Sequence, residues 1–166
     1  MHTRFAGAVA LLATGLLAGS FLYGRAIVVP TFASSALDVH LAFRVELMKR
    51  NAGIMQALMG SAIVASGWFA LTLSGRARAV SGGGAVLALT ALLVTRFGNV
   101  PINLEIKRWV AGTLAPDYPA RLHAWDVFND IRTAAALGAF LSVVVAAGLA
   151  TADDTDRAQL DGRTGG

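Results

Sequence analysis

Charged residues are bunched along the chain, and this spacing is the feature that most constrains the fold. Four blocks contain no Asp, Glu, Lys or Arg: Phe5–Gly24, Ala52–Gly75, Ala79–Thr95 and Thr133–Ala152. About 20 apolar residues cross the ~30 Å hydrocarbon core of a membrane as one helix. In lipid a helix satisfies its own backbone groups, which favours a helix even for the shorter third block. The pattern therefore predicts four transmembrane helices.

The composition points the same way. Hydrophobic residues make up 55% of the 166 residues and charged residues only 14%, whereas about 25% of a soluble domain is charged. A chain of this length has too little interior to bury such an excess, and the same excess excludes intrinsic disorder. Because there is no cysteine, a disulfide scaffold and a thiolate metal site are impossible.

These observations predict an all-α protein, an integral membrane four-helix bundle with two long helical connections on one side. We expect a membrane domain at residues 1–152, with spans at about 5–29, 52–74, 79–97 and 129–151, and a disordered polar tail at 153–166. A cleaved signal peptide is the alternative for the first block, because Arg4 precedes it. That block is longer than the apolar region of a typical signal.

Four spans place the termini and a short turn at Arg76–Arg78 on one side, and the connections 25–51 and 96–132 on the other. Positive charges favour a cytoplasmic location for the long connections, nine against five. A short Arg-x-Arg turn is hard to translocate, however, so we expect cytoplasmic termini in a bacterial plasma membrane. The net charge of +4 forms no basic stripe interleaved with aromatics, so nucleic-acid binding is not indicated.

Small residues mark where helices can approach closely. The first span contains Gly15-x-x-x-Gly19, and the second has Gly53, Gly60 and Gly67 at a spacing of seven. Such faces can pack inside one bundle or join two copies into a homo-oligomer. We favour packing inside the bundle.

Polar residues gather where the long connections enter the membrane. Pro30 and Pro101 are expected to end or bend the first and third spans. Before the second span, one predicted helical face carries His40, Arg44, Leu47 and Asn51. Before the fourth span, another carries Arg121, Trp125, Asn129, Arg132 and Thr133.

Convergent His, Arg, Asn and Trp side chains at the mouth of an apolar bundle predict a pocket for a small, apolar or aromatic ligand. Charged groups near lipid are costly and usually face the bundle interior or a water-filled cavity. For any single residue, the alternative is a helix cap or a side chain that reaches the headgroups. For Asn129, Arg132 and Thr133, one turn inside the span, we favour a functional site.

The run Arg96–Asn103, followed by Trp109 and then by W-x-x-x-N-x-x-R-T from Trp125 to Thr133, resembles the anthrone oxygenase-like family of small four-helix membrane proteins. The resemblance covers about residues 5–150, and its most specific parts are N-x-P-x-N at Asn99–Asn103 and the Trp125–Thr133 run. Members in aromatic polyketide pathways oxidise anthrones to anthraquinones. The resemblance implies the same fold, O2 as co-substrate, and neither an organic cofactor nor a metal.

Such chemistry needs a base, a hydrogen-bond donor for an oxyanion and a dry apolar slot. We predict His40 as the base, because imidazole titrates near neutral pH, with Asp117 and Glu46 as alternatives. The predicted catalytic residues are His40, Arg44, Asn129 and Arg132. The predicted substrate-binding residues are Asn99, Asn103, Trp109, Arg121, Trp125 and Thr133.

Two other function classes stay open. A metal-dependent membrane oxidoreductase would draw on His40, His123, Glu46, Asp117 and Asp126, but no His-x-x-x-His or Glu-x-x-His pair is present. A non-enzymatic membrane binding protein, transporter component or partner subunit could use the same pocket. The sequence contains no P-loop, Rossmann glycine turn or haem-attachment motif.

Overall fold

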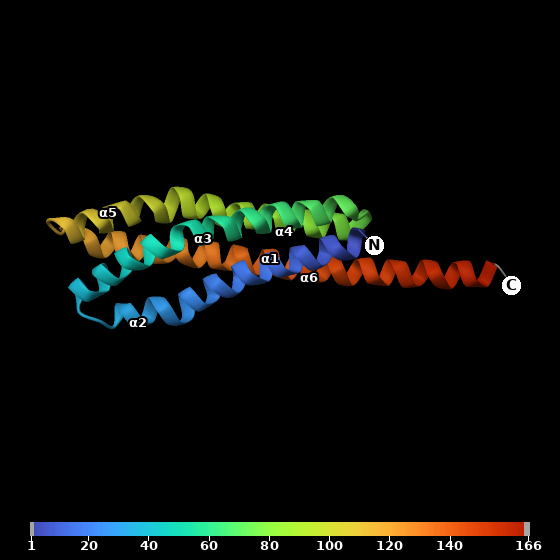
Figure 1. Cartoon of the computed structure of the whole chain (residues 1–166), viewed down its shortest axis with the longest axis horizontal. Helices are drawn as coiled ribbons and strands as arrows, with labels where there is room; N and C mark the ends of the chain where they lie inside the picture. The colour runs from blue at the N-terminus through green and yellow to red at the C-terminus, as the bar shows by residue number, and fades with distance from the viewer. Residues whose placement is uncertain (1, 165–166) are drawn as a thin grey trace.

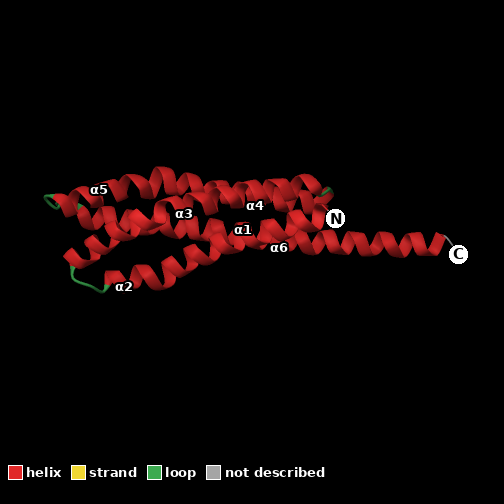
Figure 2. Ribbon diagram, in the orientation of Figure 1, coloured by secondary structure: helices red, strands yellow, loops and turns green. Residues whose placement is uncertain are grey.

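The computed structural model describes the backbone from His2 to Thr164 and the side chains from His2 to Ala152. Within that part the chain is almost wholly helical and has no strand, as Figure 2 shows. The predicted all-α class is therefore confirmed. The side chains of the predicted disordered tail, residues 153–166, lie outside the described part, and its backbone is helical up to Thr164.

Four helical rods lie side by side (Figure 1). The first comprises α1 (His2–Tyr23), the π-helical segment η1 (Gly24–Val28) and α2 (Val29–Ala33). The second is α3 (Leu37–Thr72), and the third comprises α4 (Gly75–Val94), the π-helical η2 (Thr95–Asn99) and α5 (Val100–Ala111). The fourth is α6 (Tyr118–Thr164). All four rods are long and apolar enough to cross a membrane, so the chain is an integral membrane four-helix bundle.

Both termini and the α3–α4 turn lie at one end of the bundle, as Figure 1 shows. The turn falls at Leu73 and Ser74, slightly earlier than predicted, because Arg76 and Arg78 already belong to the first turn of α4. Gly75 supplies the positive φ of 52° needed to restart the helix. Arg78 then donates from Nε to the carbonyl of Ala70 and from Nη2 to that of Leu71, in the last turn of α3.

Neither proline ends its rod. Each one follows a π-helical segment, with Pro30 after η1 and Pro101 after η2. Proline has no N–H to donate to the carbonyl four residues back, and a widened turn lets the helix continue past it. The N–H of Val100, for example, bonds the carbonyl of Thr95. The rods therefore reach far beyond the apolar blocks and carry the polar residues with them.

The half of the bundle nearest the termini, here called the terminal half, is packed with small side chains. Its buried cluster consists of Ala6, Ala10, Ala13, Ala65, Phe69, Leu73, Ala77, Val143 and Ala146. Gly84 lies so close to α6 that an added methyl group would come within 3.1 Å of the Ala139 carbonyl oxygen. Small residues thus let α4 and α6 approach closely and gain dispersion contacts.

The prediction of glycine packing inside the bundle is correct for Gly15 and wrong for Gly19 and for the glycines of the second span. Gly15 faces the ring of Phe140 inside the bundle, where an added methyl would lie 3.3 Å from it. A methyl group at Gly53, Gly60 or Gly67 would meet no neighbouring heavy atom within 4 Å. The glycine face of α3 therefore points out of the bundle, because the rotation of α3 is set by the residues it buries, such as Met59 and Ala62.

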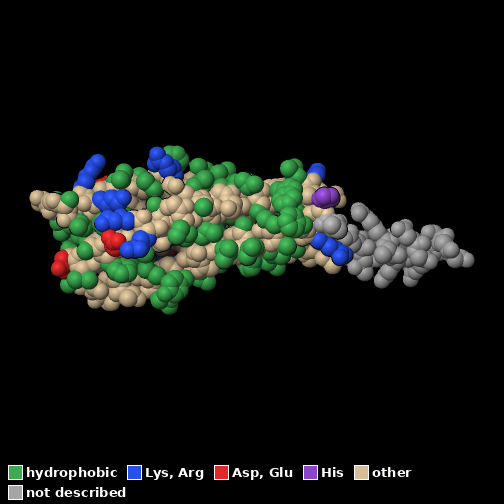
Figure 3. Space-filling model, viewed as in Figure 1, with side chains coloured by type: hydrophobic (Ala, Val, Ile, Leu, Met, Phe, Trp, Pro, Cys, Tyr) green, Lys and Arg blue, Asp and Glu red, His purple; other side chains and the backbone are tan. Residues whose placement is uncertain are grey.

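Charged side chains gather at the two ends of the visible face, with an uncharged band between them (Figure 3). The end opposite the termini, here called the cavity half, carries most of them and includes the polar parts of α3, α5 and α6. Its buried apolar cluster includes Phe32, Leu41, Ile106, Trp109 and Trp125. Both long connections thus deliver their polar residues to the same end of the bundle, as predicted.

Candidate functional site

A cavity of about 560 Å³ opens in the cavity half, where α1, η1 and α2 separate from the other rods. Most of its surface is apolar or aromatic, and ten of the lining side chains carry a hydroxyl, amide or charged group. The residues that line it are Ser20, Phe21, Tyr23, Gly24, Val28, Val29, Phe32, Arg44, Leu47, Met48, Asn51, Ala52, Met55, Gln56, Met59, Thr95, Val100, Asn103, Leu104, Lys107, Trp125, Asn129 and Arg132. Size and lining are typical of a small-molecule site.

Arg132 and Asn129 form the polar floor on α6. Asn129 is only 3% exposed, and its Oδ1 accepts from Nη2 and Nε of Arg132 at 2.8 and 3.1 Å. Nη1 of Arg132 lies 3.5 Å from Oγ1 of Thr95 on η2. Among the described residues no carboxylate forms an ion pair with Arg132. The guanidinium instead lies 4.7 Å from the ring centre of Phe21.

Arg44 supplies a second buried guanidinium from α3, and it is 3% exposed. Its Nε donates to Nε2 of His40 at 2.8 Å. Because a guanidinium can only donate, that ring nitrogen is the acceptor of a neutral imidazole. Nη2 of Arg44 lies 3.6 Å from Oδ1 of Asp126, whose side chain is partly exposed. Nη1 of Arg44 and Nδ2 of Asn129 have no hydrogen-bond partner among the described residues.

Trp125 connects the two guanidinium groups. The carbon at the centre of the Arg44 guanidinium lies 4.2 Å from its ring centre, and that of Arg132 lies 5.5 Å away. The two asparagines of the N-x-P-x-N motif hold this tryptophan in place. Nδ2 of Asn99 donates to the Trp125 carbonyl at 3.0 Å, and the indole Nε1 donates to Oδ1 of Asn103 at 2.8 Å. The motif therefore positions Trp125 and, through it, both arginines.

The structure brings half of the predicted site residues to the cavity wall: Arg44, Asn103, Trp125, Asn129 and Arg132. The other five lie behind or away from it. His40 contacts Arg44, Asn99 is fully buried beside Trp125, and Thr133 donates to the Asn129 carbonyl at 2.7 Å. Trp109 packs in the apolar cluster at the bundle end. Arg121 forms a two-pronged ion pair with Glu105, at 2.6 and 2.7 Å, which joins α6 to α5.

The alternative bases lie away from the cavity. Glu46 is exposed and pairs with Lys49 at 3.1 Å and with Arg50 at 3.6 Å. Asp117 is exposed in the turn between α5 and α6. His40 thus remains, of the three predicted bases, the one that contacts a residue of the cavity wall.

Sequence reasoning missed several lining residues. Gln56 is the clearest case, because an amide inside an otherwise apolar span is costly and marks a polar environment. Thr95 and Lys107 also line the cavity, but they belong neither to the polar helical face before the second span nor to the one before the fourth span. The methionines Met48, Met55 and Met59 carry no polar signal, and only the packing of α3 shows that they form an adaptable apolar wall.

The metal alternative finds little support from the arrangement of side chains. Between residues 2 and 152, the part with described side chains, no three His, Asp or Glu side chains come together in a group that could hold a metal ion. His123, one of the predicted ligands, is exposed on α6.

The protein is a small four-helix membrane protein, and its bundle contains a cavity with aromatic walls and buried guanidinium groups. The family model described as anthrone oxygenase matches residues 43–142. The match covers more than half of the chain, and the chain belongs to the anthrone oxygenase family. It includes the Asn99–Asn103 motif, the Trp125–Thr133 run and most of the cavity wall, but not α1. No curated protein and no solved structure matches the chain.

Proposed function

We propose that this protein is an O2-dependent membrane oxygenase that oxidises a small aromatic substrate of the anthrone type to a quinone. The observation that carries the proposal is the cavity itself, in which Arg132 and Asn129 present donors to an apolar, aromatic slot. Family membership supports the reaction class. An aromatic polyketide in secondary metabolism would be the substrate source.

The reaction needs no organic cofactor. The substrate methylene carbon loses a proton, and the negative charge moves onto the carbonyl oxygen. This electron-rich anion reacts with O2 to give a hydroperoxide at that carbon, and loss of water leaves a second carbonyl. In balance, one methylene group and one O2 molecule give one carbonyl group and one water molecule. Arg132 and Asn129 would stabilise the oxyanion, since donors in a dry site are worth far more than in water.

His40 is the proposed base, although one side chain separates it from the cavity. Its Nε2 is neutral and accepts from Nε of Arg44. If Arg44 turns towards the substrate oxygen, that lone pair becomes free to take the substrate proton. Arg44 would then have two roles. It holds the imidazole in the tautomer whose Nε2 can accept a proton, and it stabilises the negative charge that forms on the substrate oxygen.

The test is O2 uptake by the purified protein in nanodiscs with an anthrone, together with detection of the quinone. We expect one quinone per O2 consumed and no loss of activity with a chelator. Absence of O2 uptake would contradict the proposal and favour the alternative, a binding protein or partner subunit. Inactivation by the chelator, restored by one metal, would favour the metal-dependent alternative.

His40→Gln separates the base from a positioning role, because glutamine still accepts from Arg44 but cannot take up a proton. General base catalysis contributes roughly 10²–10⁴-fold, so we expect a loss of kcat in that range with KM little changed. Full activity in His40→Gln with loss in His40→Ala would make His40 a positioning residue for Arg44.

For the location, we propose a bacterial plasma membrane with cytoplasmic termini, because Arg76 and Arg78 lie beside the short α3–α4 turn. The outward glycine face of α3 leaves room for a homo-oligomer. Cysteine labelling from each side of the membrane, in this cysteine-free chain, tests the orientation directly.

A further inference from the structure

The charges around the cavity do not balance. Three cationic residues line it, namely Arg44, Lys107 and Arg132, and none of the lining residues is a carboxylate. Asp126 offsets part of the Arg44 charge from 3.6 Å. Charges in a low-dielectric environment interact strongly. The cavity is therefore an electropositive site inside an apolar bundle.

Two hydrogen-bond donors at this site lack partners. Nη1 of Arg44 and Nδ2 of Asn129 are buried and unpaired in the described part of the chain, and both residues are only 3% exposed. Leaving a buried donor unsatisfied costs free energy, and more so for a charged group. The contacts of the other Arg44 nitrogens and of Asn129 Oδ1 orient both unpaired N–H groups before any proton is taken from a substrate. A ligand oxygen would satisfy both.

The aromatic contacts indicate where such a ligand fits. Phe32 and Trp125 lie 4.8 and 4.2 Å from the guanidinium centre of Arg44, and Phe21 lies 4.7 Å from that of Arg132. A guanidinium that lies over aromatic rings keeps its N–H edge for an anion, and in Arg44 the unpaired nitrogen on that edge is Nη1. The same rings offer flat apolar walls to an aromatic body.

We propose that the cavity binds a flat aromatic acid as its anion, with a carboxylate or phenolate oxygen held by Arg44, Asn129 and Arg132. The inference rests on the proposed function and names its substrate class: the substrate already carries a negative charge when it binds, before any proton is removed by the enzyme. Lys107, which is exposed on α5, attracts the anion to the cavity mouth.

Binding of non-oxidisable probes tests this without any turnover. The probes are anthracene-9-carboxylate, its uncharged methyl ester, and decanoate as a non-aromatic anion. The protein is held in phosphatidylcholine nanodiscs, and empty nanodiscs correct for partition into lipid. Anisotropy of the anthracene fluorescence reports binding of the two aromatic probes, and competition reports decanoate.

We expect the carboxylate to bind at least about tenfold more tightly than the ester, as one charge-assisted contact provides. Arg132→Gln should weaken binding of the carboxylate roughly 10- to 100-fold and leave binding of the ester unchanged. Unchanged ester binding also shows that the variant is folded. Lys107→Gln, at an exposed position, should weaken binding of the carboxylate only about two- to fivefold.

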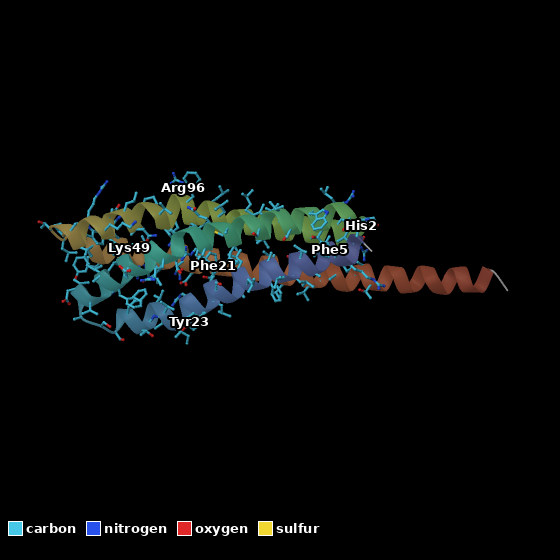
Figure 4. All side chains as sticks on the ribbon, in the orientation of Figure 1. His2, Phe5, Phe21, Tyr23, Lys49 and Arg96 are labelled. Carbon is cyan, nitrogen blue, oxygen red and sulfur yellow. The ribbon has the colours of Figure 1, made fainter. Side chains whose placement is uncertain are left out.

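Arg96→Gln is the matched control. Arg96 lies on η2 beside Thr95, but it is at the outer edge of the bundle in Figure 4 and is not part of the cavity wall. Its removal takes away the same charge from the same level of the membrane. Carboxylate affinity should not change.

Several results would overturn the proposal. Equal affinity for acid and ester, equal loss in Arg96→Gln and Arg132→Gln, or no binding of the carboxylate would each remove the anion site. Decanoate as tight as the aromatic acid, or displacement by phosphatidylglycerol in the nanodisc, would assign the site to lipid anions instead. A protein that binds the acid but consumes no O2 contradicts only the proposed oxygenase activity.

Discussion

The two halves of the bundle use the same four helices in opposite ways. In the terminal half, alanine and glycine bring the rods together, and the buried polar groups are small hydroxyls. Thr14 donates to the Ala10 carbonyl at 2.7 Å and Ser81 to the Ser66 carbonyl at 3.1 Å, while the Ser66 hydroxyl has no partner among the described residues. In the cavity half, large side chains hold the rods apart, and two buried donors lack partners among the described residues. Close packing thus supplies stability in one half, while the other half contains the cavity and two unpaired charged or amide donors, to which we assign the proposed ligand.

The largest expected difference between the halves is in activity. Arg132→Gln should lower kcat about 10²–10³-fold, because one oxyanion donor is worth that much in comparable sites. Ser81→Ala removes a buried polar contact from the terminal half and should leave kcat unchanged. Steady-state O2 uptake with an anthrone measures both. Equal losses would contradict the assignment of chemistry to the cavity half.

Substitution of three glycines by alanine tests how closely the helices approach one another. Gly98 lies against Phe128, where an added methyl would come within 2.5 Å of the ring, so Gly98→Ala should cost about 3 kcal/mol. Gly84→Ala, with 3.1 Å to a carbonyl oxygen, should cost about 1 kcal/mol. Gly60→Ala faces open space and is the control, with a change within about 0.5 kcal/mol. Unfolding in mixed detergent–SDS titrations ranks them, and a large effect at Gly60 would show that α3 buries that face.

Two ion pairs of α6 differ in burial. Asp126→Asn leaves Arg44, which is 3% exposed, without its carboxylate, and should cost about 1–2 kcal/mol, reduced by the partial exposure of Asp126. Asp130→Asn breaks the exposed pair with Arg25 and should cost no more than about 0.5 kcal/mol. The same SDS titration compares them. A larger effect at Asp130 would indicate that the Arg25 contact, which ties η1 to α6, holds the cavity half closed.

A change beside Trp125, at the centre of the site, should have a smaller effect than the loss of Asp126. Asn103→Leu removes the acceptor of the Trp125 indole N–H and should cost about 1 kcal/mol. Tryptophan emission should shift in this variant, since Trp125 loses a polar neighbour. An unchanged spectrum would mean that Asn99 and the arginines alone hold the ring. Asn51→Leu, at another lining residue, is the control.

Much of this arrangement was predictable. The four uncharged blocks indicated the rods, and the spacing of Trp125, Asn129 and Arg132 placed them on one face of one helix that now lines the cavity. The outward rotation of α3, by contrast, could not be read from its glycines, because a lipid-facing and a helix-facing glycine have the same periodicity. The two prolines were expected to end or bend their spans, and a π-helical turn before each one carries the helix onwards.

The membrane bundle, the end at which its polar residues gather and the family to which it belongs could all be inferred without a structure. These follow from the local spacing of charges and motifs along single helices. The three-dimensional packing was needed to show that Asn99 and Asn103 hold Trp125, that His40 lies behind Arg44 and that two donors are left unpaired in the described part of the chain. These contacts depend on how each helix is rotated against its neighbours, and packing between helices sets that rotation.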